Sequence, residues 1–527
     1  MNTKSDTPPT TPTEYQVQLA EKDQKIAELT ATVKWYEEQF RLSQHRRFGA
    51  SSEKTHPDQL ELNLFNEAEA LAADVSAEPD VETVTYRRKK AVGGREAKLD
   101  AFPVETIVYS LPLEEQICSC CEGQLHEMSQ ETRVEIAVIP AQVKIIRRVR
   151  IVYGCRPCER NEIRVPIVTA TMPQPVYPGS LASPSMLAHV MNQKYVESQP
   201  LYRQEQQFAR LGLELSRQTL ANWMIYGAQK WLSLLTDRMH YHLLQDDILH
   251  ADESVLQVLR EPGKAAQTDS YLWLYRTGRL GTPIVLYEYQ PSRAGEHPKT
   301  FLAGFKGYLH VDGYAGYHKV DGAVLVGCWA HARRKFDEAV KALPRDLREQ
   351  GNTASHQGLE FCNRLFAIER DLKEVAPEER YNVRMEKSKP ILDAYLAWLN
   401  TQKSRMLPKS ALGTAVEYSL NQWKKLTVFL MDGRLELDNN RSERAIKPFV
   451  IGRKNWLFAN TPRGATASAK IYSVIETAKE NNLNPFQYLK YIFEQLPQLP
   501  DPTNPEALDQ FLPWSPSLPL TCQVFKK

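Results

Sequence analysis

Three acidic residues occur in sequence contexts that could bring them together for metal chemistry. Asp252 lies inside the apolar run 248–256, and Asp312 directly follows the apolar run 308–311; both runs are predicted strands. Glu443 stands at the start of a predicted helix. If the strands are neighbours and the helix packs beside them, the carboxylates converge. Such oxygens suit two Mg²⁺ (or Mn²⁺) ions, which activate the attacking oxygen and stabilise the leaving oxygen in phosphoryl transfer.

Each of these acids also has a simpler interpretation. The functional carboxylate on the first strand could be Glu253 instead of Asp252. Asp312 could only head the glycine-containing turn that follows it. Glu443 comes three residues after Asn440, which is also the spacing of a helix capping box. Spacing alone leaves these alternatives open.

Four of the eight cysteines form two pairs with metal-ligand spacing. The pairs are Cys118-x-x-Cys121 and Cys155-x-x-Cys158. Together they could make a tetrahedral thiolate site, which suits Zn²⁺ best and leaves no open position for a substrate. Cys120 is a spare thiol that could replace a neighbour. Reduced surface thiols, or iron in place of zinc, remain alternatives.

The segment between the cysteine pairs is both strand-like and basic. Alternating apolar residues at 134–138 and 143–153 predict a small sheet. Arg147 and Arg148 belong to a dense group of basic residues there, which favours a ribbon that binds DNA phosphates. A solvated surface would have the same composition. The net charge of the whole chain, +2, carries no information about nucleic acid.

The bulk composition describes an ordinary multidomain globular protein. With 527 residues the chain exceeds one hydrophobic core, so several domains are expected. The polar start resembles no secretion signal, and no apolar run approaches the roughly 20 residues of a membrane span. We therefore expect a cytoplasmic protein with reduced thiols and no membrane partner.

Residues 15 to about 48 have the pattern of a long helix with an apolar seam. The seam residues lie seven positions apart. A second apolar row lies three positions after them, and Lys22 interrupts it. They are Leu19, Ile26, Val33 and Phe40, with Leu29 and Tyr36. This spacing is typical of a coiled coil and predicts a homodimer. The alternative is a helix docked on its own protein.

Composition and periodicity divide the chain into segments of a mixed α+β protein, in which strands followed by helices suggest a sheet covered by helices. The tail from 497 is expected to be irregular apart from a short stretch at 508–514. The predicted segments are 1–50, a disordered start and coiled-coil helix; 51–92, a linker; 93–170, a zinc ribbon; 171–245, a helical domain; 246–344, the first part of the strand-containing core; 345–430, a helical insertion; 431–482, the second part of the core; and 483–527, a C-terminal element.

Long motifs run from about residue 46 to 514 in a characteristic order. They include RFGASSEK (47–54), LSRQTLANW (215–223), HVDGY (310–314), GCWAHARRKF (327–336), DNNRSERAIKP (438–448) and GRKNWLF (452–458). In these motifs the chain resembles the large transposase of the insertion-sequence-66 family of bacterial mobile elements. The resemblance implies a protein of the bacterial cytoplasm, associated with the nucleoid. Two small accessory proteins usually accompany such chains and are candidate partners.

The resemblance implies a catalytic core similar to ribonuclease H, with an Asp-Asp-Glu triad at Asp252, Asp312 and Glu443. It also implies that 345–430 is an insertion between the second and third acids, and that the two cysteine pairs belong to a zinc finger. One departure is Cys120, where the family more often has a small residue, which leaves the ligands of the first pair slightly open. The implied enzyme is a DNA transposase that binds element ends and cuts and joins strands.

The expected reaction begins when water attacks a phosphodiester and frees a 3′-hydroxyl, which then attacks target DNA. The partner would be double-stranded DNA, both element ends and target. Basic residues near Glu443 and one in the helical domain could bind its phosphates, although solvated helix faces would look similar. These residues are Arg444, Lys447, Arg453, Lys454 and Arg217.

Two further features of the sequence each have more than one interpretation. Residues 201–223 have helix-turn-helix spacing around Gly212, with 216–220 as the reading helix, but a plain helical bundle would fit equally well. His331 could lie near the metals or contact DNA, whereas a packed histidine at a helix start is the simpler interpretation.

Three other functions compete with transposition. The chain could be a catalytically silent DNA-binding protein derived from a transposase, or a nuclease that cuts without joining. A zinc-scaffolded interaction protein is a third possibility, and it would show no salt-dependent DNA binding. The sequence leaves open the terminal-repeat sequence, the target preference and the transposition route.

Overall fold

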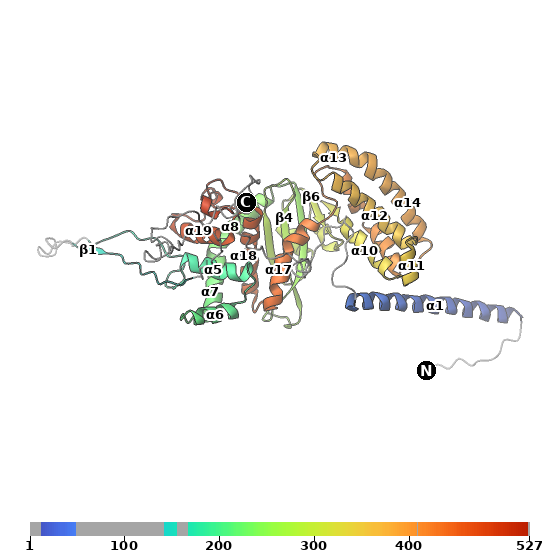
Figure 1. The fold of residues 1–527 in the computed structure, drawn as a ribbon, viewed down its shortest axis with the longest axis horizontal. Coiled ribbons are helices and arrows are strands. Elements are labelled where there is room, and N and C mark those ends of the chain that lie inside the picture. The colour runs from blue at the N-terminus through green and yellow to red at the C-terminus, as the bar shows by residue number, and fades with distance from the viewer. Residues whose placement is uncertain (1–11, 49–141, 155–166, 408, 525–527) are drawn as a thin grey trace, which may run out of the picture. The chain divides into compact units, whose positions relative to one another are not determined.

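The structure, a computed structural model, describes residues 12–48, 142–154, 167–407 and 409–524 (Figure 1). It divides into a larger unit, residues 1–65 and 171–524, and a smaller unit, residues 66–170 and 525–527. Helices and strands are both present, as the mixed α+β prediction required. The predicted linker lies outside the described residues.

In the smaller unit the described residues form a two-stranded antiparallel sheet. β1 (Val152–Gly154) pairs with β2 (Ile167–Thr169). The prediction of a strand over 143–153 is wrong for most of its length, because 142–151 lie outside strands. Alternation makes a strand only where a partner supplies ladder hydrogen bonds, and the described residues supply one only to its end. The predicted strand at 134–138 lies outside the described residues.

The larger unit continues with consecutive helices within the segment 171–245, for which helices were expected. They are α5 (Pro184–Tyr195), α6 (Leu201–Arg210), α7 (Arg217–Gly227), the π-helical turn η2 (Ala228–Leu232) and α8 (Ser233–Leu243). Ser216 caps α7, because its hydroxyl accepts the backbone N–H of Thr219. Gly212, with φ +80°, turns the chain between α6 and α7, which contact each other and α5.

A five-stranded mixed sheet forms the centre of the larger unit (Figure 1). Its strands are β3 (Ile248–Gln257), β4 (Asp269–Thr277), β5 (Val285–Gln290), β6 (Gly307–Val311) and β7 (Ala323–Gly327). The order across the sheet is β5-β4-β3-β6-β7. The first three strands are mutually antiparallel, whereas β6 and β7 run parallel to β3. β3 and β6 confirm the strands predicted at 248–256 and 308–311.

Helices cover the sheet, and one of them hydrogen-bonds to backbone groups of its edge strand β5. α17 (Asn440–Trp456) packs on β3 and β4, and α18 (Pro462–Glu480) packs on β5. The hydroxyls of Ser473 and Thr477 on α18 accept backbone N–H groups of β5 at 2.8 and 3.0 Å. An edge strand that is bonded in this way offers fewer free groups to other chains. The shorter elements α9 (Glu296–Phe301) and η3 (Ala315–Lys319) flank β6.

The predicted insertion is helical and packs around a hydrophobic cluster that it shares with Ile248 and Val326 of the sheet. Its elements, beside the sheet in Figure 1, are α11 (Arg345–Gln350), α12 (Ala354–Asp371), α13 (Pro377–Val383), η4 (Arg384–Ser388), α14 (Lys389–Lys403), α15 (Ala411–Asn421), α16 (Trp423–Leu426) and η5 (Val428–Leu430). α10 (Trp329–Lys341) contributes Trp329 and Phe336 to this cluster. The buried guanidinium of Arg384 pairs with Glu369 at 2.6 Å.

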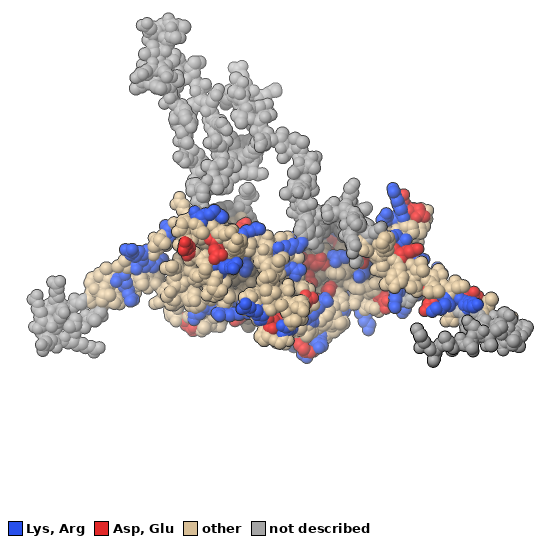
Figure 2. Space-filling model, turned by 90° about the horizontal axis from the view of Figure 1, so that it is seen from below, with Lys and Arg blue, Asp and Glu red and all other residues tan. Residues whose placement is uncertain are grey.

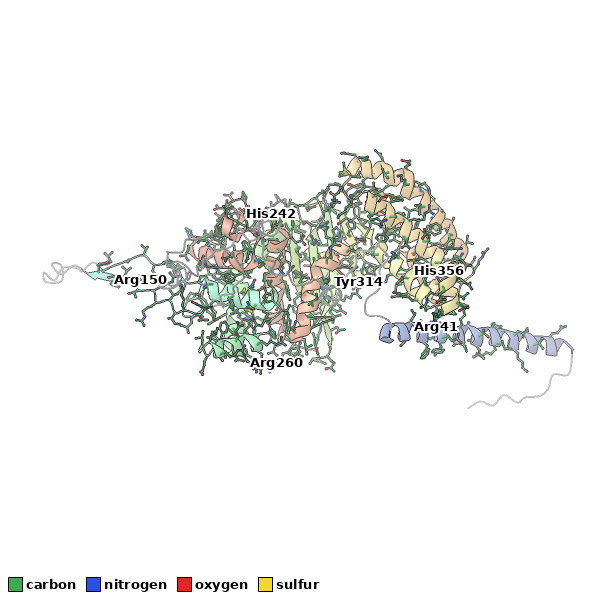
Figure 3. The ribbon with its side chains drawn as sticks, viewed as in Figure 1. Arg41, Arg150, His242, Arg260, Tyr314 and His356 are labelled. Carbon is green, nitrogen blue, oxygen red and sulfur yellow. The ribbon has the colours of Figure 1, made fainter. Side chains whose placement is uncertain are left out.

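The N-terminal helix α1 (Pro12–Phe48) has two different faces. Near its end it contacts the body, since Arg41 Nε donates to Ala342 O at 2.7 Å and Glu38 accepts the N–H of Ala411 (Figure 3). The apolar seam is exposed instead, with 56% of Val33 and 63% of Phe40 accessible. Docking on the same chain therefore occurs at the end of α1 and leaves the apolar seam exposed. The coiled coil stays a prediction.

From residue 497 on, the tail is mostly irregular between short helical turns, as predicted, whereas a regular helix precedes it. The C-terminal region contains α19 (Pro485–Gln495), η6 (Leu496–Gln498), α20 (Pro505–Asp509) and η7 (Leu520–Cys522). Apolar residues of the stretch 508–514 are buried, and Tyr488 donates its hydroxyl to Phe511 O at 2.6 Å. Asp509 pairs with Arg238 of α8 at 2.6 Å. The tail thus packs against helices, which its proline content concealed.

Candidate active site

Asp252 and Asp312 lie on neighbouring parallel strands. The register of β3 and β6 continues up to His250 opposite His310. Each acid follows its histidine by two positions, Asp252 within β3 and Asp312 directly after the end of β6. Since residues two apart on a strand share a face, the register brings both carboxylates to the same edge and the same face of the sheet.

Glu443 approaches this edge from the first turn of α17, the helix that packs on β3. Burial raises the pKa of Asp252 well above its usual value, and the negative charges of Glu253, Glu443 and Asp312 raise it further. Charges affect one another in this way only at short range. The structure therefore gathers Asp252, Asp312 and Glu443, which we call the acid cluster.

The carboxylate of Glu443 has unused bonding capacity. Its side chain is 16% exposed, and Oε1 is buried without a hydrogen-bond partner in the described part of the chain. His331 Nδ1 lies 3.8 Å from Oε1 and Arg334 Nη2 lies 3.8 Å from Oε2, and both distances are too long for a hydrogen bond. A buried acceptor in this condition is costly unless a ligand satisfies it.

The capping-box interpretation of Glu443 is wrong. The residue at the N-cap of α17 is Asn439, not Asn440. The backbone N–H of Asn440 donates to Asp438 Oδ1 at 3.0 Å, so Glu443 does not take that role. Asp312 does head a turn, because its Oδ1 accepts the N–H of Tyr314 at 2.8 Å.

Glu253 has a different environment from its neighbour Asp252. Its side chain is 2% exposed and accepts hydrogen bonds from Tyr317 Oη and Arg293, each at 2.5 Å. The Arg293 guanidinium also lies 4.2 Å from the centre of the Tyr314 ring, near the sheet (Figure 3). Glu253 is therefore a neutralised carboxylate whose oxygens already have partners.

Three further residues lie near the acid cluster: Cys328 and Asp438, which the sequence analysis did not place there, and His331, for which this was one of the alternatives. His331 and Cys328 offer ligand atoms that lie within 4.8 Å of one another and of Glu443. Burial raises the pKa of the Cys328 thiol, which opposes ionisation to a thiolate ligand. Burial and nearby acids raise the pKa of Asp438 to about 6. The signal was available, since all three stand in the motifs GCWAHARRKF and DNNRSERAIKP.

The helical insertion also reaches Asp312, which sequence distance concealed. A Cβ added at Gly313 would lie 3.0 Å from the ring of Tyr418 on α15. Lys425 on α16 has a buried Nζ without a hydrogen-bond partner among the described residues. Burial lowers the pKa of Lys425, whereas the charge of Asp312 raises it. The insertion thus forms part of the wall beside the second aspartate.

The basic residues that we expected to contact DNA differ from one another in their exposure. Figure 2 shows lysines and arginines spread over one face, with acidic groups between them. Arg147, Arg148, Arg217 and Arg444 are exposed. Arg453 is partly committed to the protein, since it donates to Val255 O and lies 5.8 Å from the Phe449 ring. Of the remaining two, Lys447 is half-buried and Lys454 is exposed.

The four predicted zinc ligands, Cys118, Cys121, Cys155 and Cys158, lie outside the described residues. Cys328, Cys362 and Cys522, which the structure does describe, are buried and free. In the described part of the chain no helix has the length and apolar character to cross a membrane.

The mixed sheet, its covering helices and the carboxylates at one strand edge define an α+β protein with an acidic site. The family described as "Transposase IS66 family" matches residues 179–467, more than half of the 527 residues. The chain belongs to this family, the insertion-sequence-66 transposases, and the resemblance in its motifs is confirmed. It is a transposase and a DNA-binding protein.

Three further matches and two relatives agree with this assignment. "IS66 C-terminal element" matches 473–514, "zinc-finger binding domain of transposase IS66" matches 115–159, and "Transposase C of IS166 homeodomain" matches 35–107. The uncharacterised proteins y4hP and y4jD of Sinorhizobium fredii are each 30% identical to this chain. The two alignments cover 88% and 87% of this chain and 86% and 89% of the relatives.

Proposed function

We propose that this transposase cuts and joins DNA strands at the acid cluster, as an Asp-Asp-Glu enzyme with a ribonuclease-H-like core. The observation that carries the proposal is the convergence of Asp252, Asp312 and Glu443 from two strands and a helix. The strand order supports the fold assignment, with three antiparallel strands followed by two that are parallel to the first.

The acid cluster fits divalent cations by its chemistry. It combines three carboxylates with a buried, unpartnered oxygen of Glu443, and hard oxygen ligands suit Mg²⁺ or Mn²⁺. Asp252, Asp312 and Glu443 would hold the ions. Two bound ions would supply Lewis-acid activation of the attacking oxygen and charge stabilisation of the leaving oxygen.

The reaction needs no covalent enzyme intermediate. In cleavage, the oxygen of water bonds to the scissile phosphorus, and the 3′-oxygen leaves and takes up a proton. In joining, that 3′-hydroxyl bonds to a target phosphorus and displaces the target 3′-oxygen. The partly buried walls around the acids, including Tyr418 and Lys425, would limit water at the site.

Zinc and DNA binding extend this proposal to the rest of the chain. Cys118, Cys121, Cys155 and Cys158 would hold a structural Zn²⁺, because the zinc-finger match spans all four. Metal analysis of purified protein tests this, and a Cys155→Ser variant should lose the zinc. The exposed Arg147, Arg148, Arg217 and Arg444, with Lys447, Arg453 and Lys454, would contact phosphates of element-end and target DNA.

We further propose that the exposed seam of α1 pairs two copies of the chain. Leu19, Ile26, Val33 and Phe40 are all more than half exposed although they are apolar and heptad-spaced. Sedimentation analysis tests this pairing. A Val33→Asp variant should be monomeric, and a dimer that survives the change would contradict the seam.

The function is tested by incubating the zinc-loaded protein and Mg²⁺ with DNA that carries the element ends. Transposition predicts nicks at the ends and joined products. Binding without nicking would support a silent DNA-binding protein, and nicking without joining would support a nuclease. Because the acid cluster is intact, we expect both cleavage and joining.

A further inference from the structure

A buried group of polar side chains lies next to the acid cluster and connects its parts. It consists of His250 on β3, Asn439 at the start of α17, and Glu436 and Arg441 on either side of Asn439 in the sequence. His250 and Asn439 are 0% and 2% exposed. We call these four residues the His250–Asn439 latch.

Asn439 makes three contacts, two to strand β3 and one to the residue before α10. Its Oδ1 lies 2.9 Å from His250 Nδ1, and its Nδ2 donates to Ala251 O at 2.8 Å. Its backbone N–H donates to the sulfur of Cys328 at 3.2 Å, directly before α10. Because Nδ2 is used toward a carbonyl, Oδ1 must be the acceptor, and His250 Nδ1 therefore donates.

The second nitrogen of His250 faces the other two residues of the latch. Nε2 lies 3.1 Å from Glu436 Oε2, and Arg441 donates to both carboxylate oxygens of Glu436 at 2.8 and 3.1 Å. The His250 ring also stacks on His310 of β6, with centroids 4.2 Å apart. The ring is thus held by the hydrogen bond at Nδ1 and by stacking on one face, while Nε2 lies beside the Glu436 carboxylate without a hydrogen bond in the described part of the chain.

These contacts bear directly on the acids. Asn439 is the N-cap of α17, and its carbonyl accepts the N–H groups of Ser442 and Glu443 at 3.1 and 3.3 Å. Its side chain is bonded to Ala251, the residue before Asp252. One side chain therefore links the first turn that carries Glu443 to the strand segment that carries Asp252.

We propose that Asn439 and His250 are positioning residues, which hold Glu443 at the distance from Asp252 that a shared metal site needs. This inference rests on the proposed metal site. Partners that orient metal ligands commonly change metal affinity 10- to 100-fold when removed. A residue that only stabilised the fold would lower thermal stability without a selective loss of metal.

The test is Mn²⁺ binding to the zinc-loaded full chain without DNA, measured by the electron paramagnetic resonance signal of free Mn²⁺. Asn439→Ala should weaken Mn²⁺ binding about 10-fold or more. Asn481→Ala is the matched control, because the Asn481 amide also donates to backbone carbonyls, those of Pro283 and Thr477, but is not part of the latch. Leu399→Ala, in the buried core of the insertion, controls for lost stability.

A double-mutant cycle with His250→Gln sharpens the result and provides a second variant if Asn439→Ala does not fold. Losses that do not add indicate that both residues act through one latch. Unchanged Mn²⁺ binding in Asn439→Ala, or an equal loss in Leu399→Ala, would overturn the inference. Glu443→Gln distinguishes failure of the proposed metal site from failure of the latch alone. If this variant binds Mn²⁺ like the wild type, the proposed metal site is wrong, and so is the latch that rests on it.

Discussion

Strand β3 carries two adjacent buried carboxylates that differ in their partners, although burial raises the pKa of both. Glu253 is neutralised by Arg293 and shares a hydrogen bond with Tyr317. Asp252 instead faces other acids, and its pKa is raised by burial and then by Glu253, Glu443 and Asp312. Successive strand residues point to opposite faces, so the two sides of one strand segment are built for different purposes.

The difference shows what each side lacks. A buried acid with a fixed arginine is complete within the protein, whereas clustered acids with an unpartnered oxygen on Glu443 remain unfavourable. Bound cations would remove that cost. The account therefore predicts that changes at Asp252 affect chemistry and metal binding, and that changes around Glu253 affect stability.

The largest expected effect is on cleavage. Asp252→Asn should reduce DNA cleavage about 1,000-fold or more, because it removes a proposed metal ligand that would be worth several kcal/mol in the transition state. Glu253→Gln should reduce cleavage far less. Single-turnover cleavage of element-end DNA measures both, with DNA binding as the control for folding. Near-normal cutting by Asp252→Asn would show that the residue is wrongly assigned.

The second effect is stabilisation by metal. Mg²⁺ or Mn²⁺ at about 100 times its dissociation constant should stabilise the wild type by about 2.7 kcal/mol. Thermal unfolding with and without the ion measures this shift. Asp252→Asn should lose most of it, whereas Glu253→Gln should keep it. Equal stabilisation of both variants by the metal ion would contradict the distinction between Asp252 and Glu253.

The third effect concerns the neutralised side. Arg293→Ala leaves Glu253 buried beside Tyr317 without its cation, so we expect a loss of about 2 kcal/mol in the free energy of unfolding. The loss is smaller than for a fully buried pair because the Arg293 side chain is 43% exposed. Chemical denaturation measures it. Arg293→Ala combined with Glu253→Gln should recover part of the stability.

The smallest effect is on pH dependence. The folded-state pKa of Asp252 is raised, so its stabilising contribution is complete below its unfolded pKa of about 3.9 and is lost as pH rises through the folded value. In magnesium-free buffer the wild type should lose stability relative to Asp252→Asn as pH increases. Denaturation midpoints between pH 4 and 8 report this difference, and parallel curves would contradict it.

Local patterns predicted the strands of the sheet and the positions of its acids. Each strand is a short apolar run bounded by turn residues, and Asp252, Asp312 and Glu443 stand in or directly beside such elements. The motifs carried the family assignment. The helical character of 345–430 also followed from periodicity alone.

Contacts between distant residues could not be read in this way. Arg293 pairs with Glu253 across 40 positions, and Lys425 approaches Asp312 from the end of the insertion. The run at 143–153 has the alternation of a strand, but only its end finds a partner in the described residues. Periodicity reports which side of an element is apolar, not which partner will cover it.

The central claim is most directly tested by anomalous diffraction from crystals of the zinc-loaded protein grown with Mn²⁺. The account predicts two manganese peaks coordinated by carboxylate oxygens of Asp252, Asp312 and Glu443. Manganese bound only elsewhere, for example at Cys328 and His331, or an acid cluster that remains without metal at saturating Mn²⁺ would contradict it.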